Sequence, residues 1–172
     1  MNKQILLKSR PLGKPTAENF TITDAPAVSA KEGELVVKAK YISVDPYMRG
    51  RMSDANSYIP PFEIDKAIEG GIVAVVTESH HPDFKIGDAV YASLQWKEVQ
   101  VVAAGKVTKL DKNIAPLSYY LGILGMPGLT AYFGLLDIGK PLAGQTVVVS
   151  GAAGAVGIVV GQIAGVTGCR VV

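Results

Sequence analysis

The sequence has 172 residues, of which 48% are hydrophobic and 19% charged, so its composition predicts a folded core and excludes a disordered chain. The net charge is +2, from 17 basic and 15 acidic residues, and the basic residues form no stripe. This balance argues against nucleic acid or an anionic membrane surface as the main partner. The single cysteine excludes a disulfide framework and favours a reducing compartment, the cytoplasm.

Short strands with frequent turns are predicted over the first two thirds of the sequence. The longest stretch of alternating polar and apolar residues covers residues 33–44, which is typical of a half-buried strand. Gly70 and Gly71 lie inside another strand and indicate either a bulge or a close backbone approach. The predicted strands cover residues 5–7, 20–22, 33–44, 67–76, 89–93, 96–102 and 107–110. This pattern favours a small β-barrel.

A sharp turn is predicted at Asp45 and Pro46. Asp at an N-cap and Pro at the first helical position favour a short helix, which carries Arg49 and Arg51. Both arginines are expected to be solvated, although either could bind a phosphate. Residues 53–66 are rich in Ser, Pro, Asn and Asp and are expected to form an irregular loop.

Helical periodicity replaces the strand pattern from residue 116 onward. Residues 117–124 are expected to be helical, and Pro127 begins a second helix. Two glycines and a proline within residues 139–144 break this helix. The apolar residues along one face of the second helix are Leu129, Tyr132, Phe133 and Leu136.

The most informative stretch begins with four β-branched residues, 146–149, which predict a parallel strand buried on both faces. A G-x-G-x-x-G pattern with Ala in first place follows, and then a helix in which Gly157, Gly161 and Gly165 recur at helical spacing. The pattern consists of Ala152, Ala153, Gly154, Ala155, Val156 and Gly157. Although the apolar run at 146–166 is long enough to resemble a membrane span, its polar residues and glycines favour a soluble α/β unit.

Each small residue of this pattern has an expected mechanical role. Ala152 permits the tight turn, Gly154 lets the backbone approach a pyrophosphate, and Gly157 lets the helix pack close to the strand. Amides of the first helical turn then face the phosphates at the positive end of the helix dipole. The sequence therefore predicts dinucleotide binding at residues 152–157. The alternative is a glycine-rich turn that binds nothing.

Four stretches carry a family resemblance: Val44-Asp-Pro-Tyr-Met-Arg-Gly-Arg-Met52, Phe84-Lys-Ile-Gly-Asp-Ala-Val90, Leu124-Gly-Met-Pro-Gly-Leu-Thr-Ala-Tyr-Phe-Gly-Leu-Leu136 and Gly151-Ala-Ala-Gly-Ala-Val-Gly157. With the expected strand-rich first part, they resemble the medium-chain dehydrogenase/reductase superfamily. The sequence is most similar to its zinc-free, NADPH-dependent double-bond reductases, which act on alkenals, prostaglandins and curcumin.

The resemblance implies a mixed α/β fold. Residues 1–115 would form a GroES-like β-barrel domain for substrate and catalysis. Residues 116–172 would form a helical connector and the first βαβ portion of a Rossmann NADP-binding domain. The implied reaction is NADPH-dependent reduction of the C=C bond of α,β-unsaturated aldehydes and ketones, with hydride delivered to the β-carbon. The implied partners are NADP(H), a small-molecule enal or enone, and a second subunit in a full-length homodimer.

The resemblance also suggests roles for individual residues. Tyr47 and Trp96 would line the substrate cleft, and Met126 and Thr130 would lie beside the nicotinamide. The alternatives stay open: Tyr47 could anchor its short helix, Trp96 could be a core residue, and Met126 and Thr130 could be ordinary packing residues at a helix start.

No zinc site is expected. Zinc-dependent relatives carry a cysteine early in the barrel, a Gly-His-Glu run and a Gly-Cys pair, whereas this sequence has Ala67-Ile68-Glu69 and Gly125-Met126 at the last two places. Cys169 is expected to be a small core residue. The adjacent His80 and His81 are expected in a solvated loop.

The resemblance places the catalytic tyrosine, and the residue that separates NAD from NADP, beyond Val172. The chain is therefore expected to be the amino-terminal half of a longer polypeptide and to be inactive by itself. The alternative functions are a zinc-free quinone reductase and a non-catalytic binding module.

Overall fold

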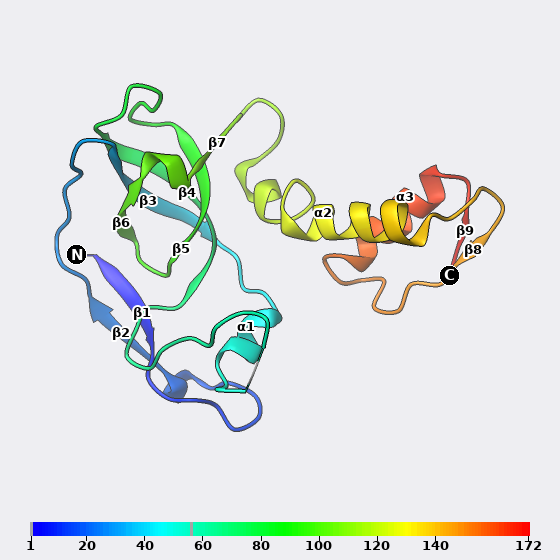
Figure 1. The fold of residues 1–172 in the computed structure, drawn as a ribbon, viewed down its shortest axis with the longest axis horizontal. Helices are drawn as coiled ribbons and strands as arrows, with labels where there is room; N and C mark the ends of the chain where they lie inside the picture. The colour runs from blue at the N-terminus through cyan, green and yellow to red at the C-terminus, as the bar shows by residue number, and fades with distance from the viewer. Residues whose placement is uncertain (1, 56) are drawn as a thin grey trace. The chain divides into compact units, whose positions relative to one another are not determined.

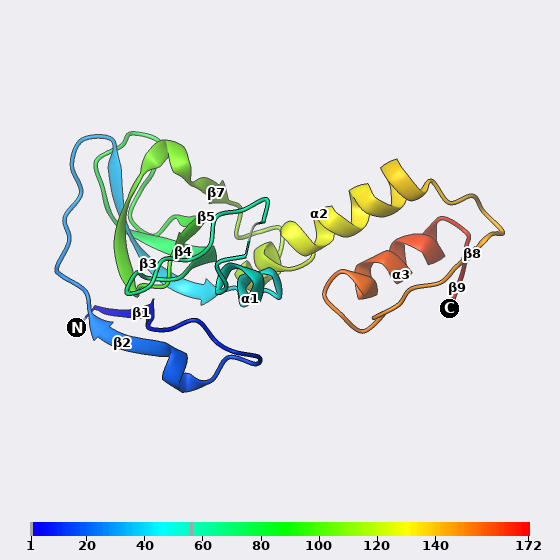
Figure 2. The same ribbon diagram turned by 60° about the horizontal axis from the view of Figure 1, so that its bottom comes forward.

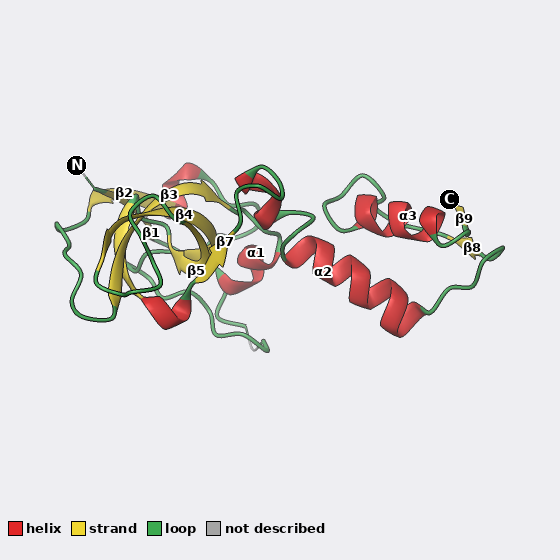
Figure 3. Ribbon diagram, turned by 90° about the horizontal axis from the view of Figure 1, so that it is seen from above, coloured by secondary structure: helices red, strands yellow, loops and turns green. Residues whose placement is uncertain are grey.

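The computed structural model describes residues 2–55 and 57–172. The chain separates into two compact units, Met1–Ile114 and Ala115–Val172. Longer strands are confined to the first unit, and the second is mainly helical, as the colours of Figure 3 show. None of the helices in the described ranges has the length and apolar character that crossing a bilayer requires.

Two antiparallel sheets build the first unit (Figure 1). The smaller sheet pairs β1 (Lys3–Leu7) with β2 (Phe20–Asp24). The larger has the order β6-β3-β4-β5-β7. Its strands are β3 (Glu34–Ile42), β4 (Glu69–Ser79), β5 (Ala89–Gln95), β6 (Val99–Ala103) and β7 (Thr108–Leu110). All seven predicted strands are thus present. Among the described residues β6 and β7 do not pair with each other, so closure into a barrel is not confirmed.

The interior strands β3 and β4 are buried more deeply than simple alternation predicts. Residues 35–37 of β3 and 72–74 of β4 are buried at consecutive positions. Consecutive side chains of a strand point to opposite faces, so both faces of these segments are covered. The prediction of a half-buried strand is therefore wrong for residues 35–37. Residues 38–42 are exposed apart from the half-buried Ala39, so half-burial does not describe this end of the strand either.

The glycine pair in β4 marks neither a bulge nor the predicted close backbone approach, because the group that approaches Gly70 is a side chain. Gly70 and Gly71 pair in unbroken register with Leu94 and Ser93 of β5. A Cβ atom on Gly70 would overlap the terminal methyl group of Met48. The absence of a side chain at Gly70 therefore makes room for Met48, the buried residue of helix α1.

Helix α1 (Tyr47–Arg51) starts without the predicted side-chain cap. Pro46 occupies the N-cap position, and no side chain caps the helix. Asp45 contributes only its main-chain carbonyl, which accepts a hydrogen bond from the Met48 amide at 3.0 Å. Because that carbonyl already satisfies the Met48 amide, the Asp45 carboxylate makes no cap, and the N-cap prediction for Asp45 is wrong.

The arginines of α1 hold loops together and are half-buried, so their predicted solvation is right only in part. Arg49 donates hydrogen bonds to the carbonyl oxygens of Gly13 at 2.8 Å and Pro11 at 3.0 Å. Arg51 donates to the Pro60 carbonyl at 3.0 Å and lies 4.0 Å above the Phe62 ring. The guanidinium N–H groups that could bind a phosphate thus already donate hydrogen bonds to loop carbonyls. The loop at 53–66 has neither helix nor strand in its described residues, and Asn56 lies outside them.

Two hydrophobic clusters form the core of the first unit. The larger lies in the five-stranded sheet, and the smaller joins β1, α1 and the segment before β4. The smaller cluster consists of Leu7, Met48, Met52, Phe62 and Ile68. Trp96 packs against both clusters, since it follows β5 directly. Full burial of each such aliphatic or aromatic side chain contributes about 1.5–3 kcal/mol. Two 3-10 turns, η1 (Ala17–Asn19) and η2 (Ala104–Lys106), complete the unit.

The second unit begins with the 3-10 helix η3 (Leu117–Leu121) where a longer helical segment was predicted. Helix α2 (Met126–Tyr132) has Pro127 in its first turn, as predicted, and continues as a π-helical segment, η4 (Phe133–Gly139). Lys140 then adopts the left-handed conformation with φ 46° and ends the helix where a break was predicted. Helix α2 contacts α3 (Gly157–Val166), and Figure 2 shows the two side by side.

The parallel strand predicted at residues 146–149 is present only in part. Strand β8 (Thr146–Val147) pairs in parallel with β9 (Arg170–Val171), and α3 connects them. Val148 is 76% exposed, so burial on both faces is wrong for the described residues. Within this unit β8 has one neighbouring strand, and α3 packs against that neighbour. One strand and one helix cannot cover both faces of a two-stranded sheet.

Candidate functional site

The glycine-rich turn at residues 150–156 lies between β8 and α3. Gly151 has φ 69°, a conformation that favours glycine. Its carbonyl accepts a hydrogen bond from the Gly154 amide at 2.9 Å, and the Gly154 carbonyl accepts one from Ile158 at 3.0 Å. The turn is therefore closed on itself and leads directly into the first turn of the helix.

Three consecutive amides at the start of α3, that of its first residue and those of the two residues before it, have no protein acceptor among the described residues. Ala155, Val156 and Gly157 make no amide hydrogen bond to any residue in the described part of the chain, and no side chain caps the helix. Ala152 to Ala155 are solvent-exposed. Unpaired amides at the positive end of a ten-residue helix can bind an anionic phosphate group. The residues present therefore fit the pyrophosphate of a dinucleotide.

Gly157 has a different role from the predicted one. A Cβ atom on Gly157 would overlap the Gly151 carbonyl oxygen within the turn itself. At Gly161, a Cβ would lie 3.6 Å from a methyl group of Val171 in β9, which is an ordinary van der Waals contact. Gly157 therefore allows the turn to pack against the start of the helix, whereas its predicted role was to let the helix pack against the strand.

Met126 and Thr130 lie one turn apart on α2. The Thr130 hydroxyl donates to the Met126 carbonyl at 2.7 Å and lies 3.6 Å from the Met126 sulfur. Both side chains are exposed within the described residues. Sequence reasoning missed the neighbouring Gly125 and Gly128, where a Cβ would overlap the carbonyl oxygens of Tyr120 and Ile123, respectively. A glycine spacing of three at a helix start was the available signal.

Tyr47 and Trp96 come together on the smaller core cluster of the first unit, against which both pack. Burial raises the pKa of the Tyr47 phenol above its ordinary value, and the negative charge of Asp45 adds to this shift. A phenol is already protonated at neutral pH, and a shift in this direction leaves Tyr47 a hydrogen-bond donor there. The indole N–H of Trp96 is buried and makes no hydrogen bond to any of the described residues.

The two histidines and the cysteine, which were not expected to bind zinc, contact ordinary protein groups. No group of three His, Cys, Asp or Glu side chains that could hold a metal ion occurs in residues 2–55 and 57–172. His80 lies 3.1 Å from the Glu78 carboxylate, and His81 lies 3.8 Å from that of Asp83. Cys169 is half-buried and donates to the Leu142 carbonyl at 3.4 Å.

Known proteins resemble the chain over its whole length. Residues 3–110 match the family described as the N-terminal domain of oxidoreductase. A Bacillus subtilis protein named as an NADP-dependent oxidoreductase is 56% identical over 171 residues, which are 99% of this chain and 50% of that protein. The NADPH-dependent curcumin reductase of Escherichia coli is 46% identical, again over 99% of this chain and 50% of its own length.

The crystal structure of CurA from Vibrio vulnificus in complex with NADPH superposes with a TM-score of 0.92 and 49% identity, over 98% of this chain and 50% of that chain. The chain thus spans about half the length of the relatives it matches. It belongs to the medium-chain dehydrogenase/reductase family of curcumin, alkenal and prostaglandin reductases and matches the amino-terminal half of its members.

Proposed function

We propose that the protein, in its full length, reduces the C=C bond of α,β-unsaturated aldehydes and ketones with NADPH and without a metal. The observation that carries this proposal is the 46% identity to the curcumin reductase, together with 43% identity to the 2-alkenal reductase of Nicotiana tabacum. These two relatives act on different carbonyl compounds. The substrate class is therefore proposed as enals and enones, and no single compound is assigned.

The division of the chain into two units supports two domain roles. Residues 1–115 would be the GroES-like, barrel-shaped substrate domain, since five of their strands form one antiparallel sheet. Residues 116–172 would be the helical connector and the first βαβ portion of a Rossmann domain. The parallel pair β8 and β9 joined by α3 supports this role.

NADPH, when bound, supplies the hydride for the β-carbon. The amides of Ala155, Val156 and Gly157 would hold its pyrophosphate, because they are unpaired and lie at a helix N-terminus. Ala152, Ala153 and Gly154 would form the exposed turn beside it. Met126 and Thr130 would lie next to the nicotinamide.

Tyr47 and Trp96 would line the substrate cleft. The Tyr47 phenol would donate a hydrogen bond to the carbonyl oxygen on which negative charge develops. The bulk of Trp96 would exclude water from that side. The relatives are about twice as long as this chain, and we propose that further catalytic groups complete the site in the full-length protein. The same proposal includes a homodimer and a cytoplasmic location.

The experiment is NADPH oxidation by the full-length protein against a panel of enals, enones and quinones, with a Tyr47→Phe variant alongside. The proposal predicts turnover of enals and enones and slower turnover by Tyr47→Phe at unchanged NADPH affinity. Turnover of quinones alone would favour a quinone reductase. No turnover with any compound would favour a non-catalytic binding module, and either result would contradict the proposal.

A further inference from the structure

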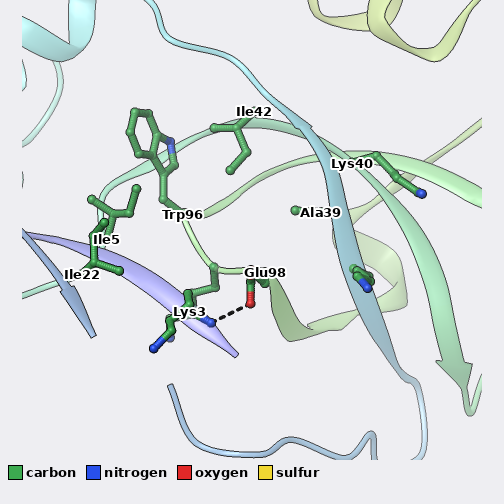
Figure 4. A pocket seen from close by; sticks show the side chains of 10 residues that line it. Lys3, Ile5, Ile22, Ala39, Lys40, Ile42, Trp96 and Glu98 are labelled. Atoms are coloured by element: carbon green, nitrogen blue, oxygen red, sulfur yellow. Dashed lines mark hydrogen bonds between the residues drawn. The ribbon is translucent and has the colours of Figure 1, made fainter. Parts of the chain in front are cut away.

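A hollow of about 430 Å³ lies in the first unit, between the small sheet and β3. Its volume falls within the range of small-molecule sites, about 300–1,000 Å³. The close view in Figure 4 shows the side chains that line it. The apolar part of the lining comes from four segments and consists of Ile5, Ile22, Ala39, Ile42 and Trp96.

The segment that follows β5 fixes the walls of this hollow. The carbonyl of Trp96 accepts a hydrogen bond from the Ile5 amide at 2.9 Å, and the Glu98 carbonyl accepts one from Ala39 at 2.8 Å. The Lys3 amide donates to the Glu98 carboxylate at 2.9 Å, the dashed line in Figure 4. Both β1 and β3 are therefore tied to residues 96–98, and the hollow is held open by backbone hydrogen bonds.

Two isoleucines in the lining remain uncovered. Ile22 is 69% exposed and Ile42 is 39% exposed. Covering such side chains with an apolar group is favourable, because it removes their surface from water. Binding of a ligand with an alkyl portion would therefore be favoured by burial of these side chains.

The polar part of the lining carries mostly positive charge. It consists of Lys3, Lys38, Lys40, Lys97 and Glu98. Lys3 forms an ion pair with Asp24 at 2.7 Å. The ammonium groups of the other three lysines have no ion-pair or hydrogen-bond partner among the described residues. Glu98 is the only acidic residue in the lining, and its carboxylate already accepts the Lys3 amide.

We propose that this hollow binds an amphipathic anion, such as a medium-chain carboxylate. The alkyl chain would lie on Ile22, Ile42 and Trp96, and the carboxylate would meet the unpaired lysines at the rim. Exposed ion pairs contribute little individually, so the apolar contact supplies most of the affinity and the lysines supply the preference for an anion. This inference goes beyond the proposed reaction, because it requires neither NADPH nor turnover, and the hollow shares only Trp96 with the proposed substrate cleft.

The test uses Trp96, the only tryptophan of the sequence, as a reporter. Decanoate is titrated into the protein without NADPH while tryptophan emission is recorded, and a Trp96→Phe variant identifies the signal that belongs to Trp96. A saturable change in emission is expected. The triple variant Lys38→Gln, Lys40→Gln, Lys97→Gln should bind decanoate at least about fivefold more weakly. Uncharged decanol should bind the parent protein more weakly than decanoate does.

A matched triple variant controls for the loss of charge. Lys14, Lys31 and Lys106 are exposed, do not line the hollow, and have no side-chain partner in the described ranges. Their replacement by Gln should leave decanoate affinity within about twofold. Equal losses in the two triple variants, or equal affinities for decanol and decanoate, would overturn the assignment of an anion site. Absence of a saturable signal would overturn the site itself.

A second pair of variants keeps the test decisive if the rim variant fails to fold. Ile22→Glu places a negative charge in the lining at an exposed strand position, and Ile22→Leu keeps the apolar surface there. Decanoate binding should be lost in the first and retained in the second. Retained binding in Ile22→Glu would contradict the proposal. So would binding that weakens as protein concentration rises, because a second copy of the chain would then occupy the hollow.

Discussion

Gly157 and Gly151 are in such close contact that a methyl group on Gly157 would overlap the carbonyl oxygen of Gly151. The same carbonyl accepts a hydrogen bond from the Gly154 amide at 2.9 Å. It therefore closes the turn and also contacts the first residue of the helix. The direction of the unpaired helix amides therefore depends on this contact. Any side chain at residue 157 must move the turn or the helix.

The first prediction is that Gly157→Ala lowers NADPH affinity of the full-length protein by about tenfold or more. The overlap with backbone resembles overpacking, which costs about 1–3 kcal/mol, and backbone atoms cannot move aside as a flexible side chain can. Titration of NADPH by calorimetry measures the effect. Gly165→Ala is the matched control on the same helix, since a Cβ there meets nothing within 4 Å. Equal affinities in the two variants would contradict the assigned role of Gly157.

The second prediction concerns Gly70 and Met48. Gly70→Ala should lower the free energy of unfolding by about 1–2 kcal/mol, because the new methyl group would overlap the end of the Met48 side chain. Combining it with Met48→Ala should cost less than the sum of the two single changes, which urea unfolding of all four proteins would show. Gly50→Ala has free space and should be neutral or stabilising. Additive changes in the free energy of unfolding would mean that a methyl group at residue 70 does not contact the Met48 side chain.

The third prediction is a pH dependence at Asp88. Its hydrogen bond with Lys109, at 2.6 Å, and then that from the Lys85 amide, at 2.8 Å, hold the pKa of this carboxyl below its ordinary value of 3.8. A lowered folded-state pKa gives stability that is present above the unfolded-state value and is lost as pH falls through the folded-state value.

Asp88→Asn should therefore be less stable than the parent protein at about pH 7, with a smaller difference at about pH 3, in urea unfolding. Asp54→Asn is the control, because Asp54 is exposed and has no ion pair in the described residues. A difference for Asp88→Asn that is unchanged at low pH would show that its ionic contacts do not contribute.

Much of the fold could be predicted from sequence because turn chemistry and periodicity act locally. Pro127 starts its helix, and residues 139–144 end it, since proline and glycine restrict the backbone without help from distant residues. Burial depends on what packs from elsewhere. For this reason Val148 is exposed where a buried strand was predicted, and residues 35–37 are buried on both faces where a half-buried strand was predicted.

The candidate site divides in the same way. The exposed turn at 152–157 could be predicted, because its small residues and following helix are contiguous. The roles of Arg49 and Arg51 could not be predicted, because their side chains donate to carbonyls of separate loops. A local sequence pattern does not show such contacts with Pro11, Gly13 and Pro60. The hollow beside Trp96 could not be predicted either, since it arises where strands distant in sequence meet.

The fourth prediction is metal independence. Ile68 and Met126 stand where the resemblance places zinc ligands in zinc-dependent relatives, and neither side chain can supply the imidazole or thiolate that zinc prefers. Prolonged dialysis of the full-length protein against a chelator should leave NADPH-dependent turnover unchanged. Turnover lost on dialysis and restored by zinc would contradict this prediction.

The central claim is that hydride reaches the β-carbon of an unsaturated carbonyl compound. The most direct measurement uses NADPH carrying deuterium at the transferred position, with the full-length protein and an acyclic enone, and locates deuterium in the product by nuclear magnetic resonance. The predicted product is the saturated ketone with deuterium on the carbon β to the carbonyl. An allylic alcohol with deuterium on the former carbonyl carbon would contradict the claim.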